Sequence, residues 1–301
     1  MTEASGRQLQ SPFDPLSRPF YGMLAALGLA VALGILLTDF VVGDGPVVGL
    51  FLSACAGCLG GLSARRAGWG RVAIYFEAAS LSTVVGGLTI GAMIMLCAVS
   101  APFADRQLNA ADQILKLDWL ALYRIYAAHP AVATVSRWAY GTMVPQTLIV
   151  PLLIAHDRER FWTFNTAWIV TVVATLAAFP FFPAEGPYKL HNVPLQAISG
   201  WERFFPADTS RIITGIREGS IRNITETGTG LISMPSFHAA CGVLLMWAGS
   251  GWLRWVVVPL NLCLICATVI TGAHYFVDII AGVAVALLAI GAAQELVRMA
   301  R

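Results

Sequence analysis

Two stretches decide how this chain is interpreted: M-P-S-F-H-A at residues 234–239, and G-A-H-Y-F-V-D at residues 272–278. Each places imidazole, hydroxyl or carboxyl groups at the start of a long apolar run. An ionisable group at membrane depth is costly, so it is a functional hypothesis by default. Asp278 follows His274 by four residues, which puts both on one helix face and lets the carboxylate orient the imidazole. The two stretches therefore predict one site at the ends of two membrane helices.

The first stretch is also typical of the N-terminus of a helix. Pro235 suits the first turn of a helix, where a missing N–H costs nothing. The free amides of Ser236, Phe237 and His238 would then point out of the helix N-terminus, which is a natural seat for a phosphate. The alternative is that His238 and His274 are unrelated packing residues. Their matching depth and the nearby aspartate favour a shared site.

These residues carry a resemblance to a known family. P-S-F-H at 235–238 resembles the second signature, P-S-G-H, of the type 2 phosphatidic acid phosphatase superfamily. His274 and Asp278 resemble the H-x-x-x-D that closes its third signature. Phe237 in place of the glycine, and the turn F-P-A-E-G-P at 182–187, are more similar to the branch related to inositol phosphorylceramide synthases. The resemblance is specific over residues 233–282 and extends back to about residue 180.

The sequence departs from that family in two cations. Lys189 fits the lysine of the first signature, K-x6-R-P, but Gln196 stands where its arginine is expected. Thr268 replaces the arginine of the third signature. A phosphate dianion needs cationic or amide donors, so we expect replacements from the loop 190–233. The residues expected to bind substrate are Tyr188, Lys189, Ser236, Phe237, Arg211, Arg217 and Arg222, with Arg203 as a further loop arginine.

The composition is that of a membrane protein. Hydrophobic residues make up 57% of the chain and charged residues 12%, about half the charged share of soluble domains. The net charge of +2 gives no sign of nucleic-acid binding. Runs of about 20 apolar residues can each cross a bilayer. The runs expected to do so are 20–40, 46–64, 73–101, 138–156, 163–183, 235–250, 252–272 and 274–296.

The sequence thus predicts an all-α polytopic helical bundle with about eight transmembrane spans. Residues 1–19 are expected to be a disordered cytoplasmic tail, and residues 20–301 a single membrane-embedded domain whose catalytic part is about 180–296. Residues 102–137 are too poor in apolar content to cross, and their aromatic residues predict a helix at the membrane surface. Ile212, Ile213 and Ile216 predict an amphipathic cover over the site.

Orientation follows from the short connections, where lysine and arginine favour the cytoplasm. One set of connections carries pairs such as Arg65–Arg66 and Arg158–Arg160, whereas the short loops of the other set have no basic residue. Both termini are then cytoplasmic, and His238, His274 and Asp278 lie at the extracytoplasmic end. We expect an integral protein of the bacterial inner membrane, with its site facing the periplasm or the outside.

Phosphoryl transfer needs a nucleophile, a proton for the leaving oxygen and positive charge around the equatorial oxygens. His274 backed by Asp278 matches the nucleophile, and His238 matches the acid. The resemblance implies these same roles through a phosphohistidine, with no metal or other cofactor. Spacing alone distinguishes neither nucleophile from acid nor a metal-free site from a metal on these three residues.

The expected substrate is a lipid phosphate, because the site opens at a bilayer surface among membrane lipids. Water as the acceptor gives a phosphatase, whereas an alcohol such as a ceramide gives a headgroup transferase. The competing class is a transporter or non-catalytic scaffold, for which Glu77 in the third run would be the central residue. We interpret Glu77 as a structural acid. Because the two family arginines are missing, a catalytically inactive member of the family is a further alternative.

Overall fold

A computed structural model describes residues 14–193, 209–223, 230–271 and 273–301 of the chain. Within these residues the regular structure is helical, and strand pairing is limited to one isolated bridge between Val41 and Asn223. The prediction of an all-α bundle is confirmed. The long helices are α1 (Arg18–Leu37), α2 (Asp44–Arg66), α3 (Gly70–Ala98), α8 (Arg158–Ala178), α12 (Arg254–Thr271) and α13 (Phe276–Met299). The shorter ones are η1 (Pro15–Ser17), α4 (Asp105–Ile114), α5 (Trp119–Ala128), α6 (Pro130–Gly141), α7 (Met143–Ile154), η2 (Phe179–Phe181), α9 (Pro187–Leu190), α10 (Thr209–Glu218) and α11 (Phe237–Ala248).

Five helices of the described chain are long and apolar enough to cross a membrane: Pro15–Leu37, Val72–Ala98, Arg158–Phe181, Arg254–Thr271 and Phe276–Met299. Two further predicted spans correspond to α7 and α11, which are apolar but have 12 residues each. Twelve residues rise about 18 Å, less than the roughly 30 Å of a bilayer core. The 46–64 run forms α2. Five of the predicted spans are thus supported, and the count of eight stays a prediction.

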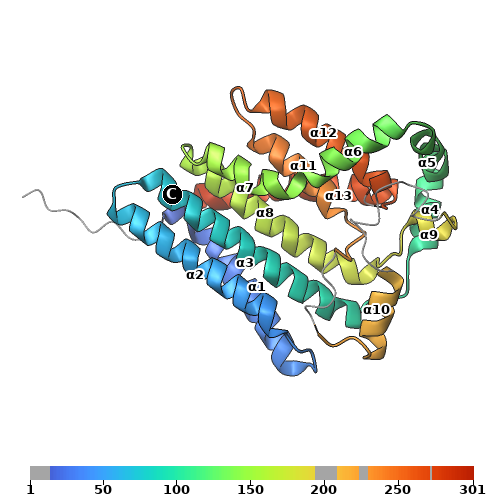
Figure 1. Ribbon diagram of the computed structural model, residues 1–301, viewed down its shortest axis with the longest axis horizontal. Helices are drawn as coiled ribbons and strands as arrows, with labels where there is room; N and C mark the ends of the chain where they lie inside the picture. Colours follow the sequence, from blue (N-terminus) through green and yellow to red (C-terminus); the bar gives the residue numbers. More distant parts are fainter. Residues whose placement is uncertain (1–13, 194–208, 224–229, 272) are drawn as a thin grey trace, which may run out of the picture.

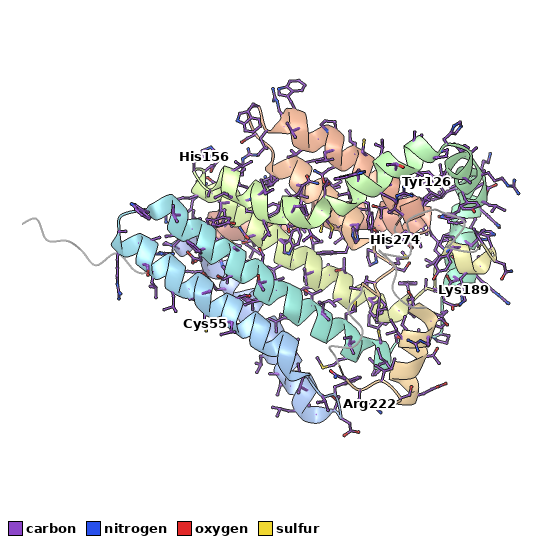
Figure 2. All side chains as sticks on the ribbon, in the orientation of Figure 1. Cys55, Tyr126, His156, Lys189, Arg222 and His274 are labelled. Atoms are coloured by element: carbon purple, nitrogen blue, oxygen red, sulfur yellow. The ribbon has the colours of Figure 1, made fainter. Side chains whose placement is uncertain are left out.

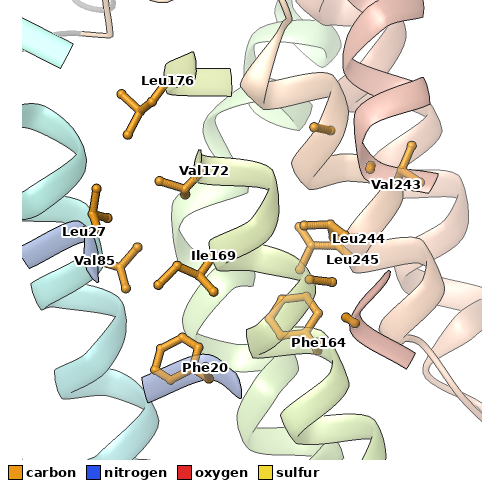
Figure 3. Close-up of a cluster of buried hydrophobic side chains, with 14 of the residues drawn as sticks. Phe20, Leu27, Val85, Phe164, Ile169, Val172, Leu176, Val243, Leu244 and Leu245 are labelled. Carbon is orange, nitrogen blue, oxygen red and sulfur yellow. The ribbon is translucent and has the colours of Figure 1, made fainter. Parts of the chain in front are cut away.

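The centre of the bundle is α8. In Figure 3 its Phe164, Ile169, Val172 and Leu176 lie between Leu27 and Val85 on one side and Leu244 and Leu245 on the other. These partners belong to α1, α3 and α11, so α8 is packed on opposite faces. Because helices in lipid gain little from apolar burial alone, such close packing is what holds the bundle together.

The folded chain begins earlier than the sequence predicts. The Asp14 carboxylate accepts hydrogen bonds from Arg158 Nε and Trp162 Nε1, both at 2.9 Å, and Ser17 is buried. Residues 14–19 therefore belong to the bundle and not to the predicted tail, because Asp14 ties them to the start of α8. The rest of that tail, residues 1–13, lies outside the described residues.

Several arginines lie together at one end of the bundle. Arg158 and Arg160 lie in the first turn of α8, and Arg160 donates to the Trp247 carbonyl at the end of α11. Arg301 pairs with Glu159, which brings the C-terminus to the same end. Glu77 accepts hydrogen bonds from Tyr21 and Arg65, so it joins α1, α2 and α3. The C-terminus and His274 lie at opposite ends of the molecule (Figures 1 and 2).

Candidate active site

His274 is carried by the reversal between α12 and α13. The turn includes Ala273 in the left-handed region, at φ 52°, and is closed by a bond from His274 N to the Val269 carbonyl at 3.2 Å. Asp278 lies in the first turn of α13 and accepts from Tyr275 N at 3.1 Å. A carboxylate at this position satisfies a free amide of the helix start. The same carboxylate therefore fixes its own helix and faces His274.

The His274–Asp278 pair is deeply buried. The His274 side chain is 6% exposed and that of Asp278 is 0% exposed, with Nδ1 and Oδ2 3.3 Å apart. Asp278 Oδ2 also accepts from Ser233 Oγ at 2.8 Å. Asp278 Oδ1 makes no hydrogen bond to any described residue. A carboxylate on Nδ1 favours the tautomer in which the proton is on Nδ1 and the lone pair on Nε2.

Ser236 brings the other helix to this pair. Its Oγ lies 3.5 Å from His274 Nε2, and the same hydroxyl caps α11 by accepting from Ala239 N at 3.4 Å. Its backbone N–H donates to the Asp278 carbonyl at 2.9 Å. The N-terminus of α11 therefore lies directly against the first turn of α13, with Nε2 facing it.

His238 has a different neighbour. Its ring stacks on Tyr140 of α6, with centroids 4.2 Å apart and planes 11° apart. The Tyr140 hydroxyl is 3.3 Å from His238 Nδ1. Because the rings are nearly parallel, the hydroxyl lies over the imidazole, so this contact is stacking more than a hydrogen bond. His238 follows Ser236, whose Oγ lies 3.5 Å from His274 Nε2, by two residues.

The remaining predicted substrate residues are Phe237, Tyr188 and Lys189, and the loop arginines. Phe237 packs edge-on against Trp168, beside Ser236. Tyr188 packs on the aromatic cluster that Trp119 and Tyr126 form with the end of α12. Lys189 is exposed on α9, at the same end of the molecule as His274 (Figure 2).

Two of the loop arginines predicted to bind substrate contact other parts of the chain. Arg217 donates to Ser100 Oγ at 2.8 Å and to the Ala101 carbonyl, and its guanidinium lies 4.9 Å from the centroid of Phe103. Arg222 lies 5.5 Å from the Phe40 ring, and Arg211 is exposed on α10. The described contacts of Arg217 and Arg222 are with these segments and not with His274. Arg203 lies outside the described residues.

The amphipathic helix predicted around these arginines is present as α10. Its Ile212, Ile213 and Ile216 are buried and belong to the main core, where α10 packs on α3. The helix therefore covers the end of α3.

Sequence reasoning missed two buried aspartates on α4. Asp105 accepts from Glu185 N at 3.0 Å, Gly186 N at 2.8 Å and the Tyr275 hydroxyl at 2.9 Å. Asp112 accepts from Phe276 N at 2.9 Å and Val277 N at 2.8 Å. Their spacing of seven residues, which places them on one helix face, was the available signal. Ser233 and Tyr140 were missed as site neighbours too, and nothing in their local sequence marks them.

No three His, Cys, Asp or Glu side chains of the described residues are grouped so as to hold a metal ion.

A model of the PAP2 superfamily matches residues 106–292, more than half of the chain. The chain belongs to the PAP2 superfamily. No curated protein and no solved structure matches it. The matched region begins well before residue 180, so the superfamily part includes Asp112 and Tyr140 as well as both histidines. Helices α1 to α3 precede it. With its long apolar helices, the chain is a membrane protein of a phosphatase-type superfamily.

Proposed function

We propose that this PAP2 protein is an integral-membrane lipid phosphatase or phosphotransferase that acts through a phosphohistidine on His274. The observation that carries the proposal is the arrangement of the His274 ring. Nδ1 is held by Asp278, and Nε2 faces Ser236 at the N-terminus of α11. Two segments, about 38 residues apart in the sequence, thus present a nucleophilic nitrogen to a seat for an anion.

In the proposed reaction, the Nε2 lone pair attacks phosphorus and the bond from phosphorus to the lipid oxygen breaks. Asp278 stabilises the positive charge that develops on the ring. His238 gives a proton to the leaving oxygen. Its stacking on Tyr140 fixes the plane of this imidazole beside the first turn of α11.

The phosphate oxygens would be held at the start of α11. The Ser236 hydroxyl and the first-turn amides of Phe237 and His238 are donors without partners inside the helix. Lys189 would add a charge from the surface of the same end. Amide donors of this kind offset the loss of the family's two arginines, at positions 196 and 268.

A lipid phosphate fits the surroundings of this end. Phe181 and Phe182, which precede the turn carrying Glu185, are 68% and 41% exposed. Exposed aromatic side chains at the end of an apolar helix are typical of a membrane–water interface. We place this end at the extracytoplasmic face of a bacterial inner membrane, on the argument from the arginine distribution.

The acceptor that resolves the phosphohistidine sets the class of reaction. Water gives a phosphatase, and a lipid alcohol gives a headgroup transferase like the inositol phosphorylceramide synthases. Phe237, where many members have glycine, resembles the second class, and its ring packs edge-on against Trp168.

The test is turnover by the detergent-purified protein in EDTA, on a panel of lipid phosphates with and without alcohol acceptors. We expect His274→Ala to lower turnover by about three orders of magnitude or more. The matched control is His156→Ala, at an exposed turn far from His274 (Figure 2), which should leave turnover unchanged. Turnover that is indifferent to His274, or absent on every lipid, would refute the proposal. A requirement for an alcohol acceptor would identify a transferase.

A further inference from the structure

The consecutive helices α4 and α5 hold the turn that carries His274 at both of its ends. Asp112 accepts the backbone N–H groups of Phe276 and Val277, at the start of α13. Trp119 Nε1 donates to the Val269 carbonyl, near the end of α12, at 3.1 Å. These contacts join residues about 150 or more positions apart in the sequence. The turn between α12 and α13 is therefore held by hydrogen bonds from Asp112 and Trp119 as well as by its own bonds.

Asp105 adds a third contact and connects a second segment. It accepts the Tyr275 hydroxyl, next to His274, and the N–H groups of Glu185 and Gly186. Gly186 has φ 107°, and a Cβ placed there would lie 2.7 Å from the Ala273 carbonyl. The proline-rich turn thus packs directly on the His274 turn, and one carboxylate fixes the two together.

Both aspartates are buried, Asp105 at 7% exposure and Asp112 at 1%. A buried carboxylate is strongly disfavoured unless its oxygens accept hydrogen bonds. Here the donors that satisfy them belong to the His274 turn and the proline-rich turn. Neither aspartate contacts His274 or Ser236 through any described hydrogen bond, so their influence on the site passes through the backbone that they hold.

We propose that Asp105 and Asp112 are positioning residues that fix the His274 ring against the N-terminus of α11. The proposal rests on the function proposed above, because it gives these residues a part in the same reaction. Loss of a positioning contact misplaces the nucleophile, and a displacement near 1 Å lowers a rate by about 100-fold. The effect falls on the chemical step and leaves binding of the lipid largely intact.

Two variants, one expected to lower kcat more than the other, test the positioning role. Asp112→Asn keeps one acceptor oxygen but loses the second acceptor and the charge. Tyr275→Phe deletes only the hydroxyl that Asp105 accepts, and it keeps a ring that is fully buried. We expect kcat to fall by about 10- to 100-fold for Asp112→Asn and by less for Tyr275→Phe, with KM within about two-fold of wild type.

The matched control is Asp14→Asn, the same substitution at the opposite end of the bundle. Asp14 also accepts several hydrogen bonds, from Arg158, Trp162 and Leu16. Asp14→Asn should lower the thermal unfolding midpoint in detergent and leave kcat and KM unchanged. A kcat that falls in all three variants in step with the unfolding midpoint would show a purely structural role and overturn the proposal.

A second readout does not depend on turnover. In spectra of protein labelled with ¹⁵N-histidine, the Nδ1–H of His274 should give a hydrogen-bonded signal, assigned by its loss in His274→Ala. We expect Asp112→Asn and Tyr275→Phe to shift or broaden that signal and Asp14→Asn to leave it in place. If no lipid is turned over but the signal responds in this way, the proposed function fails and the positioning stands. An unchanged signal in both site variants overturns the positioning.

Discussion

At the scale of single residues, the geometry of the site depends on a glycine, Gly282, where a side chain would not fit. Gly282 lies one turn after Asp278, and a Cβ there would come closer to the Ser236 carbonyl oxygen than real Cβ atoms do. The backbone of Ser236 is bound to the Asp278 carbonyl at this point. Glycine therefore sets how closely α11 approaches α13, and with it the distance from Ser236 to His274.

This close approach gives a prediction with a control on the same helix. Gly282→Ala should push the start of α11 away from α13, lowering both the unfolding midpoint and kcat. Gly291→Ala meets nothing within 4 Å, so it should keep kcat and raise stability by up to about 1 kcal/mol through helix propensity. Thermal unfolding in detergent and turnover measure both effects. Equal kcat in the two variants would contradict the role of Gly282.

Residues were predictable where the chemistry is local in sequence. His274 and Asp278 are four apart, and their predicted pairing is present, although His274 lies in the turn before α13 and not on a helix face with Asp278. The helix start predicted at Pro235 is displaced to Phe237, with Ser236 as its N-cap. Tyr140 lies 98 residues from His238. Its place in the site arises from how α6 packs, and no local pattern in a single sequence encodes that. The positions of Arg217 and Arg222 were beyond prediction for the same reason.

At the scale of elements, α4 shows what a hydrophobic pattern leaves out. The sequence predicts a surface helix within residues 102–137, and α4 and α5 are helices there. They hold the His274 turn through hydrogen bonds between aspartate oxygens and backbone amides. Backbone amides are the same in every residue, so the partner of such a bond leaves no mark in the sequence.

Helix lengths were predicted less well, because an apolar run does not show where a helix breaks. The run 138–156 is divided at Thr142 between α6 and α7, and Pro151 lies inside α7. In the run 235–250 the helix begins at Phe237, after Pro235. Proline lacks an N–H and its ring crowds the preceding turn, which fits the start of α11 only after Pro235; Pro151 lies within α7 and does not end it.

The charge of Asp112 predicts a pH dependence. Burial raises the pKa of Asp112 and the charge of Asp278 raises it further, against the opposing effect of the Phe276 and Val277 N–H groups. The folded chain therefore binds this proton more readily than the unfolded chain. Acidification through the raised pKa favours the folded state at this residue but removes the charge and weakens the hydrogen bonds that Asp112 accepts from the α13 amides, so kcat should fall.

The pH profile of kcat measures this effect. In wild type we expect a step at a pH above the usual range of an aspartate, and Asp112→Asn should lack that step. The Asp14→Asn protein is the control and should keep it. An acidic limb of identical shape in wild type and Asp112→Asn would contradict the prediction.

At the scale of the whole molecule, residues 106–292 and the helices that precede them have different relations to the superfamily. The match begins at residue 106, whereas signature residues alone indicated the resemblance only from about residue 180. Residues 106–180 include contacts such as those of Asp112 with the first amides of α13, which no signature residue marks. Helices α1 and α3 nevertheless pack on α8, the helix at the centre of the core, and α2 packs on α3.

The two ends of the bundle predict how the protein sits in its membrane. Arg158 pairs with Asp14 and Arg301 pairs with Glu159, so these arginines lie where both ends of the described chain meet. The C-terminus and His274 lie at opposite ends of the molecule (Figures 1 and 2). Arginine-rich connections stay in the cytoplasm. We therefore expect Ile114→Cys, exposed at the α4 end, to react with a membrane-impermeant thiol reagent on intact cells. Arg298→Cys, exposed near the C-terminus, should react only after the cells are opened. Wild type gives the background from its own cysteines, and the reverse pattern of labelling would place the site in the cytoplasm.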